Sequence, residues 1–297
     1  MWSEQTLQLI RNACDEDLGR SGDISARLLP GSEGDVAAGV VSRTGGICCG
    51  LALGALICRV FGERLDAGLA FEALPATGGR DPEGQRVEPG QTIATVRGPR
   101  AAVLGVERTL LNFLGRMSGV ATLTRRYLEA AHAANPRVQI LDTRKTIPGW
   151  RELDKYAVRI GGGTNHRLGL YDAVLIKDNH LVGIPVANLA RALSDALERI
   201  EGRPAFVEVE VDRLEQLAEV CAVDAVDVVL LDNFALDELR AAVGYRDSHG
   251  HGGRPALEAS GNVTLKTVGE IAGTGVERIS VGALTHSAAS LDFGLDF

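Results

Sequence analysis

The chain has 297 residues and a formal net charge of −8, because 39 acidic residues outnumber 31 lysines and arginines. This balance excludes a general nucleic-acid binder and a polybasic membrane anchor, since both need a surplus of positive charge. The five cysteines form no C-x-x-C pair, which argues against a zinc site or disulfide framework and predicts a reducing, cytoplasmic setting. The apolar run of residues 47–61 contains two glycines and an arginine and is too short to span a membrane.

The first hundred residues predict a mixture of helices and strands. Ser3 can act as the N-cap of a helix over residues 3–15, whose apolar residues recur at helical spacing. A strand is expected over residues 36–42 and a helix of small residues over 49–61. Pro89-Gly90 is a turn signal between two short β-rich runs, so residues 84–98 are expected to form a hairpin.

The pattern changes from residue 107 onward. A long helix is expected over residues 107–134, with an interruption at Gly119. Six short apolar runs follow, at residues 138–141, 173–176, 205–211, 225–231, 256–259 and 278–281. Amphipathic segments alternate with them, at residues 151–159, 186–200, 212–223, 235–243 and 265–272.

This strand–helix alternation predicts parallel βαβ units. Six units are fewer than the eight of a complete α/β barrel, which usually needs about 250 residues. An incomplete, TIM-like α/β barrel therefore fits better than a complete one. A doubly wound sheet is the alternative, but no G-x-G-x-x-G motif opens a helix after the first strand.

Polar or glycine residues follow every one of the six predicted strands. Ligands of parallel α/β folds bind at the carboxyl ends of the strands. The residues at these ends that are best suited to bind a ligand are Arg144, Lys145, Lys177, Asp232, Ser260, Gly261 and Gly282. We therefore predict that the functional site lies at this edge of the sheet.

The third predicted strand contains alternating acids, Glu208 and Glu210, with Asp212 after it. A period of two places these acids on one face, where an unpaired buried charge is costly. They need a cation, which can be a lysine, an arginine or Mg²⁺. Lys177 on the preceding strand is one candidate, and carboxylate oxygens also suit Mg²⁺.

A glycine-rich segment, residues 161–163, precedes Asn165-His166-Arg167. With Arg144, Lys145 and Lys177, the pair His166 and Arg167 would form a cationic pocket in an acidic protein. Arginine binds carboxylates in a two-pronged manner, whereas lysine acts as a compact point charge. The expected substrate therefore carries several negative groups.

Ser260-Gly261 lies before the predicted helix 265–272, and Gly282 ends the next strand. Exposed N–H groups at a helix N-terminus bind phosphate, and the last two loops of an α/β barrel often form such a site. We expect these residues to bind a phosphate. Lys155 and Lys266 are expected on helix surfaces, outside the site.

Several segments in order along the chain carry a resemblance to a known family. They are Glu107-Arg108-Thr109, Asp142-Thr143-Arg144-Lys145-Thr146, Gly161-Gly162-Gly163, Asn165-His166-Arg167, Lys177-Asp178-Asn179-His180, Glu208-Val209-Glu210-Val211, Leu231-Asp232-Asn233 and Val281-Gly282-Ala283-Leu284-Thr285-His286. From about residue 107 to the C-terminus the chain resembles the quinolinate phosphoribosyltransferases, also called nicotinate-nucleotide pyrophosphorylases (carboxylating).

The resemblance implies a reaction and an architecture. Quinolinate and phosphoribosyl pyrophosphate, with Mg²⁺, would give nicotinate mononucleotide, pyrophosphate and CO₂ for NAD synthesis. An N-terminal open-faced α/β sandwich domain (1–115, joined by the tail 286–297) and a C-terminal incomplete barrel domain (116–285) are implied. So is a homodimer in which Arg108 reaches the partner's site.

The resemblance also implies roles for individual residues. The quinolinate clamp would consist of Arg108, Arg144, His166, Arg167 and Lys177. Lys145 would neutralise the phosphoribosyl donor, and Mg²⁺ or the ribose hydroxyls would be held by Glu210 and Asp232. The phosphates would meet Ser260, Gly261 and Gly282, with His286 close by. The catalytic set would be Lys145, Lys177, Glu210 and Asp232, acting mainly by positioning and electrostatics.

Three other functions fit parts of the pattern. A Schiff-base aldolase would use Lys177 as nucleophile, although the acids near it argue against this chemistry. A non-catalytic anion-binding protein would keep the fold but lose charged positions, and none of the expected ones is missing. A related phosphoribosyltransferase-like enzyme would act on another base.

Overall fold

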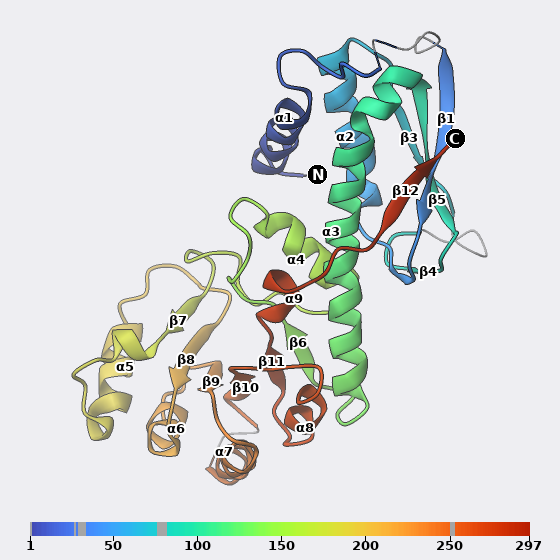
Figure 1. The fold of residues 1–297 in the computed structure, drawn as a ribbon. Coiled ribbons are helices and arrows are strands. Elements are labelled where there is room, and N and C mark those ends of the chain that lie inside the picture. The colour runs from blue at the N-terminus through green and yellow to red at the C-terminus, as the bar shows by residue number, and fades with distance from the viewer. Residues whose placement is uncertain (1, 27, 29–33, 76–81, 250–252) are drawn as a thin grey trace. The chain divides into compact units, whose positions relative to one another are not determined.

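A computed structural model describes residues 2–26, 28, 34–75, 82–249 and 253–297 (Figure 1). These residues form two compact units. Unit 1 comprises Met1–Arg125, Thr146–Gly162 and Ser287–Phe297. Unit 2 comprises Arg126–Lys145 and Gly163–His286.

Unit 1 contains an antiparallel sheet with the strand order β12-β1-β5-β3. Its strands are β1 (Asp35–Ser42), β3 (Ala70–Ala73), β5 (Thr92–Pro99) and β12 (Phe293–Asp296). The helices of this unit include α1 (Glu4–Leu18) and α2 (Leu51–Leu65), and Figure 1 shows both on one side of the sheet. The predicted helix 3–15, strand 36–42 and helix 49–61 are confirmed, and Ser3 caps α1 by accepting the Thr6 N–H.

The hairpin expected over residues 84–98 is wrong. The turn exists, because Gly90 has φ +84° and Gln91 N–H donates to the Glu88 carbonyl. However, β4 (Arg86–Val87) pairs with β2 (Gly46–Ile47), whereas β5 pairs with β1 and β3. The turn therefore moves the chain from one sheet to another.

The interruption expected at Gly119 is also wrong. Helix α3 (Arg100–His132) is continuous, with residues 100–125 in unit 1 and the remainder in unit 2. A Cβ on Gly119 would lie 2.1 Å from the Ala289 carbonyl oxygen. This glycine allows the C-terminal segment to approach the helix backbone closely.

Lys155, expected on a helix surface, is only 1% exposed. It lies on α4 (Arg151–Ile160), where Leu153, Asp154, Ala157 and Val158 are also buried. These residues cover more than one face of the helix, so burial is not limited to an apolar stripe. Lys266 is exposed, as expected.

Unit 2 contains a parallel sheet of six strands in the order β6-β11-β10-β9-β8-β7, which confirms the incomplete α/β barrel. The strands are β6 (Gln139–Leu141), β7 (Val174–Ile176), β8 (Val207–Val211), β9 (Val228–Asp232), β10 (Ala256–Ser260) and β11 (Arg278–Ser280). Each corresponds to one predicted apolar run. Strand β8 is buried along its whole length, as expected of a strand covered on both faces.

The helices of unit 2 follow the strands in sequence. They are α5 (Leu189–Leu197), α6 (Leu214–Cys221), α7 (Leu236–His249), α8 (Val268–Ala272) and α9 (Ala283–His286), with 3₁₀ turns η1 (Asp178–His180) and η2 (Val186–Asn188). Helix α7 is longer than predicted and α8 is shorter. Connections of this kind place the carboxyl ends of all six strands at one edge of the sheet.

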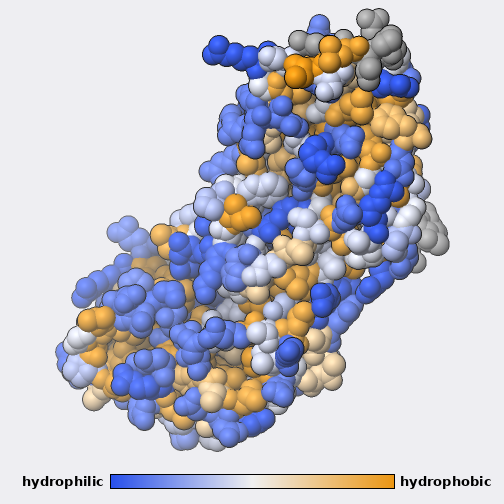
Figure 2. All heavy atoms as spheres, viewed as in Figure 1, coloured by the Kyte–Doolittle hydropathy of each residue, from blue (hydrophilic) through white to orange (hydrophobic). Residues whose placement is uncertain are grey.

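Hydrophilic residues cover much of the face drawn in Figure 2, interspersed with smaller hydrophobic areas. Among the described residues, no helix has both the length and the apolar sequence needed to cross a membrane.

Candidate active site

A cavity of about 480 Å³ lies in unit 2, at the carboxyl ends of its strands. Its walls include residues that follow β6, β7, β9 and β10. The lining residues are Thr143, Arg144, Lys145, His166, Arg167, Leu175, Lys177, Glu210, Leu230, Asp232, Asn233, Glu258, Ser260, Gly261, Asn262 and Ser280. Nine of the twelve residues expected in the site are among them.

The charge of this cavity is opposite to that of the whole chain. Four lysine and arginine side chains and His166 line it, against three carboxylates. The chain as a whole carries a net charge of −8. Such a local reversal of sign suits an anionic ligand.

The segment Asn165-His166-Arg167 is held in place by the end of β6. Thr164 pairs with Leu141 as a short parallel extension of the sheet edge. Asp142, which is fully buried, accepts hydrogen bonds from Asn165 Nδ2 at 2.6 Å and from the His166 backbone N–H at 2.9 Å. The residues after the glycine-rich segment are therefore fixed to the end of β6 rather than carried on a free loop.

The arginines of the site repel one another. Arg167 is 6% exposed, and its burial together with the charge of Arg144 lowers the pKa of its guanidinium group. Arg144 and Lys145 are exposed. Among the described residues neither forms an ion pair within 4 Å, so an anion can reach both.

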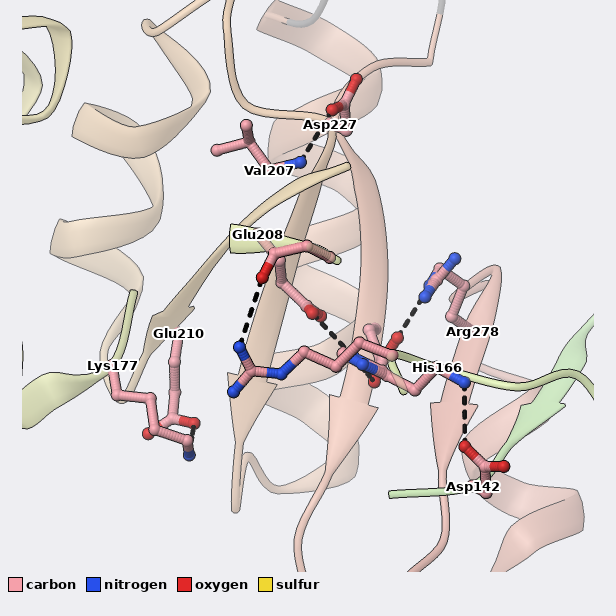
Figure 3. A network of polar contacts seen from close by, with 11 residues as sticks. Asp142, His166, Lys177, Val207, Glu208, Glu210, Asp227 and Arg278 are labelled. Atoms are coloured by element: carbon pink, nitrogen blue, oxygen red, sulfur yellow. Dashed lines mark hydrogen bonds and ion pairs between the residues drawn. The ribbon is translucent and has the colours of Figure 1, made fainter. Parts of the chain in front are cut away.

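Lys177 and Glu210 form an ion pair at the mouth of the barrel, with Lys177 Nζ 2.5 Å from Glu210 Oε2 (Figure 3). The two glutamates of β8 thus have different partners. Glu210 pairs with Lys177, whereas Glu208 pairs with His166. Asp212 lies outside the lining and pairs with Arg213.

Glu210 and Asp232 line the same cavity and provide the carboxylate oxygens that Mg²⁺ prefers. Glu210 is 9% exposed and Asp232 ends strand β9, so both side chains belong to ordered strands. These two carboxylates therefore fit a Mg²⁺ ion, to which a phosphate and water would also bind.

His166 is the centre of a buried network (Figure 3). Its Nε2 lies 2.7 Å from Glu208 Oε2 and 3.4 Å from Glu258 Oε1, and Arg278 Nε donates to Glu258 Oε2 at 2.7 Å. Burial alone would lower the pKa of His166, but the hydrogen bonds and charges of Glu208 and Glu258 raise it to about 9.

The two carboxylates of this network differ. Burial and the charge of Glu258 raise the pKa of Glu208 to about 7. Burial also opposes ionisation of Glu258, but His166 and Arg278 outweigh it and lower the pKa of that carboxyl group. Glu258 is therefore the permanently charged member of the pair at neutral pH.

Ser260 and Gly261 lie in the cavity wall, but the helix expected directly after them does not begin until Val268. The helix begins three residues later than the predicted Leu265, and phosphate binding by these residues stays a prediction. Gly261 has φ +103°, and a Cβ there would lie 2.1 Å from Asn233 Oδ1. This glycine permits close contact between the loops that follow β9 and β10.

Gly282 and His286 are not part of the cavity lining, but they lie beside it. A Cβ on Gly282 would be 3.1 Å from His286 Nε2 and 3.1 Å from Lys145 Cδ. The Thr285 hydroxyl donates to the Lys145 carbonyl at 2.8 Å. Short helix α9 thus supports the loop that carries Lys145.

Arg108 belongs to unit 1, on α3, and its side chain is 65% exposed. It is the one expected site residue that lies outside unit 2.

Sequence reasoning missed Asp142 as a positioning residue and missed Glu258 and Arg278 altogether. Glu258 is a lone acid inside an apolar run, and Arg278 begins the neighbouring run. A charge at an inward position of a predicted barrel strand was therefore the available signal.

Comparison with known proteins identifies the family. Residues 23–118 match the family described as quinolinate phosphoribosyl transferase, N-terminal domain, and residues 120–296 match the C-terminal domain of that description. A protein of Mycobacterium leprae named nicotinate-nucleotide pyrophosphorylase (carboxylating) is 39% identical over 289 residues, covering 97% of this chain and 95% of that protein.

Solved structures agree. NadC from Streptococcus pyogenes has a TM-score of 0.87 at 31% identity, covering 100% of this chain and 97% of that one. The nicotinate-nucleotide pyrophosphorylase from Francisella tularensis has a TM-score of 0.83 at 34% identity, covering 99% of this chain and 97% of that one. The chain belongs to the quinolinate phosphoribosyl transferase family.

Proposed function

We propose that this chain transfers the phosphoribosyl group of phosphoribosyl pyrophosphate to quinolinate and releases pyrophosphate and CO₂, giving nicotinate mononucleotide for NAD synthesis. Its relatives bear the name of this activity. The observation that carries the proposal is the cluster of Arg144, Lys145, Arg167 and Lys177 around one cavity of an acidic chain. A dicarboxylate and a polyphosphate are the ligands such a cluster suits.

The reaction needs no covalent nucleophile on the protein. The quinolinate nitrogen attacks the anomeric carbon of the ribose, and the bond to pyrophosphate breaks. When CO₂ departs from C2, the positive charge of the pyridinium ring stabilises the electron pair left on that carbon, and a proton from water then forms the C2–H bond of nicotinate mononucleotide. The protein's part is to orient the two anions and stabilise charge, which is the work of Arg144, Arg167, Lys177 and His166 on quinolinate and of Lys145 on the donor.

Glu210 and Asp232 would hold Mg²⁺, which supplies charge neutralisation to the pyrophosphate group when bound. The same carboxylates favour the positive charge that develops at the anomeric carbon. Ser260, Gly261 and Gly282 would face the phosphates, with His286 beside Lys145.

The active assembly would be a homodimer in which Arg108 completes the partner's site. Two observations support this proposal. The Arg108 side chain is exposed and has no place in the cavity of unit 2. Exposed apolar residues of unit 2 suit an interface, since Leu170 is 72%, Tyr171 84% and Val182 80% exposed.

A cytoplasmic setting is the third part of the proposal. None of the five cysteines is in a disulfide bond, although Cys48 and Cys49 are adjacent and buried. Free thiols suit a reducing compartment.

The purified protein should be given quinolinate, phosphoribosyl pyrophosphate and Mg²⁺, and nicotinate mononucleotide and CO₂ measured together. Equal amounts of both products are expected. Replacing quinolinate with nicotinate should give no nucleotide, and a preference for nicotinate or another base would replace this proposal with the related-transferase alternative.

The Schiff-base aldolase is the weaker alternative. A lysine that forms a Schiff base is activated by desolvation or by a neighbouring cation, whereas Lys177 is ion-paired with Glu210. Borohydride with a carbonyl compound should leave Lys177 unmodified, and trapping at that lysine would favour the aldolase.

A further inference from the structure

The His166 ring has one edge turned toward the sheet and away from solvent. Its Nε2 is within 3.4 Å of carboxylate oxygens from both Glu208 and Glu258, and each glutamate is 0% exposed. Among the described residues no hydrogen bond to Nδ1 is found, and His166 is part of the cavity lining. The edge that remains for a ligand is therefore the Nδ1 edge.

The ring is held by packing as well as by hydrogen bonds. Phe206 meets it edge-on, with ring centroids 5.3 Å apart and planes at 83°. The same phenyl ring lies under the Arg278 guanidinium group at 5.5 Å. Asp142 fixes the His166 backbone from the other side. The position and orientation of the imidazole are thus set before any ligand arrives.

The buried carboxylates of Glu208 and Glu258, when ionised, need positive charge close by, because an uncompensated buried charge is costly. Arg278 supplies one such charge, through Glu258 Oε2. Arg167 acts on Glu208 from farther away. His166 Nε2 is the nitrogen that lies within 3.4 Å of both glutamates.

We propose that Glu258, anchored by Arg278, and Glu208 act as positioning residues that keep His166 a fixed cation, so that its Nδ1–H donates to one carboxylate of the dicarboxylate substrate. The identity of that substrate rests on the proposed function. We call Glu208, Glu258 and Arg278 the cradle of His166. The cradle explains how a histidine gives a permanent charge in a pocket whose other cations are arginines and lysines.

Other charged groups also face this ring or its cavity. On the sheet side they are Glu208 of β8, Glu258 of β10 and Arg278 of β11. Asp142 accepts the His166 backbone N–H, and Arg167 is the next residue in the chain. On the cavity side they are Arg144, Lys145, Lys177, Glu210 and Asp232. The two carboxylates that touch the ring outweigh the more distant cations.

Glu258→Gln is the main test, because it keeps the side chain's size but removes its charge. Quinolinate binding to the full-length protein should be measured by calorimetry between pH 6 and 9.5. We expect at least a 10-fold loss of affinity at pH 8.5 but less than 3-fold at pH 6, with KM for the donor unchanged. Glu258→Asp should recover most of the affinity, and Glu215→Gln, an exposed carboxylate on α6, should match the wild type.

A loss of affinity that is equal at all pH values would overturn the proposal, since it would indicate a structural role only. Should Glu258→Gln fail to fold, Glu208→Gln serves the same purpose.

A second measurement needs no substrate and separates this inference from the proposed function. The six histidines can be labelled with ¹⁵N in their rings, and the His166 signals assigned by their loss in His166→Asn. At pH 8 we expect the imidazolium form in the wild type and the neutral form in Glu258→Gln. A neutral ring in the wild type would refute the cradle even if quinolinate is the substrate. If quinolinate does not bind but the imidazolium is seen, the proposed function fails and the cradle stands.

His166, Glu208 and Glu258 also have a geometry that a divalent cation could use. Zn²⁺ titration by calorimetry tests this alternative. No binding that depends on His166 is expected, and stoichiometric binding lost in His166→Asn would replace the cradle with a metal site.

Discussion

The two ends of the parallel sheet in unit 2 use charged residues differently. At the amino ends, Arg246 of α7 is 3% exposed and bonds to Asp247, Glu277 and the carbonyls of Gly253 and Pro255. At the carboxyl ends, Arg144 and Lys145 line the cavity and, among the described residues, lack an ion-pair partner within 4 Å. Charged side chains with partners in the protein join strands and helices, whereas those without partners can bind a ligand.

Two acids at the amino ends, Asp227 and Glu277, also have their partners within the protein. Asp227 accepts the Val207 N–H at 2.9 Å and pairs with Arg254, and Glu277 accepts the Leu257 N–H at 2.9 Å. These carboxylates bind the backbone at the start of neighbouring strands. Glu208, the second residue of β8 and a partner of His166, has a buried oxygen, Oε1, with no hydrogen-bond partner among the described residues. The comparison teaches that the charged groups at the amino ends have their partners within the protein, whereas Arg144 and Lys145 in the cavity lack an ion-pair partner among the described residues.

Removing a ligand-facing cation should have the largest effect. Arg144→Ala and Lys177→Ala should each lower kcat/KM for quinolinate by about 100-fold or more, because a charge that stabilises the bound anions is lost. Steady-state rates give the effect, and thermal unfolding checks that the fold is intact. Near-normal turnover in either variant would remove that residue from the site.

Removing the satisfied cation at the opposite end should affect stability instead. Arg246→Ala leaves two carbonyls and a partly buried acid without their partner and should cost about 3 kcal/mol of unfolding free energy. Urea unfolding measures the loss. Turnover below the unfolding transition should stay within about 2-fold of the wild type. A large loss of kcat with unchanged stability would contradict the distinction between the two ends.

Metal removal tests the acids of the carboxyl end. Chelation should abolish turnover and Mg²⁺ should restore it. Glu210→Gln and Asp232→Asn should each raise the Mg²⁺ concentration for half-maximal rate by about 10-fold, as expected for loss of one charged ligand. Asp227→Asn, at the amino end, is the matched control and should leave the Mg²⁺ dependence unchanged. Full activity in excess chelator would remove Mg²⁺ from the account.

Mixed subunits test whether Arg108 of unit 1 serves another chain's cavity. In a random mixture of Arg108→Ala and Lys177→Ala subunits, half the dimers are hybrids with one intact site each, so about a quarter of all sites should recover. The rate of the mixture after subunit exchange is compared with the two separate variants. Absence of recovery, with hybrids demonstrated by mass, would count against the shared site.

The buried histidine should give a small pH effect on stability. The pKa of His166 is about 9 in the folded chain and about 6.5 in the unfolded one. A raised pKa stabilises the fold fully below about pH 6.5, and this contribution is lost as the pH rises through 9. The stability advantage of the wild type over His166→Asn should therefore shrink between pH 6.5 and 9.5 in urea unfolding. An advantage that grows over this range would show the opposite sign.

The sequence predicted all six strands of the barrel, because each is a short apolar run bounded by helical segments. It also placed the cavity residues at the strand ends, since Arg144, Lys177 and Asp232 follow such runs within three residues. Strand pairing was less accessible. The turn at Pro89-Gly90 was visible, but its flanking strands pair with partners distant in sequence.

The predictions for Gly119 and Lys155 were wrong for the same reason. Gly119 looked like a helix break because its role depends on Ala289, which lies far along the chain. Lys155 looked like a surface residue because its burial depends on how α4 packs in unit 1. Tertiary contacts of this kind leave no local pattern in the sequence.

The central claim is that the unsatisfied cations at the carboxyl end bind a dicarboxylate for transfer and decarboxylation. Release of labelled CO₂ from quinolinate carrying the label in its 2-carboxyl group tests it most directly, with phosphoribosyl pyrophosphate and Mg²⁺ present. We predict one CO₂ for each pyrophosphate released in the wild type, and neither product in Arg144→Ala. Pyrophosphate release without CO₂, or unchanged CO₂ release in Arg144→Ala, would contradict the account.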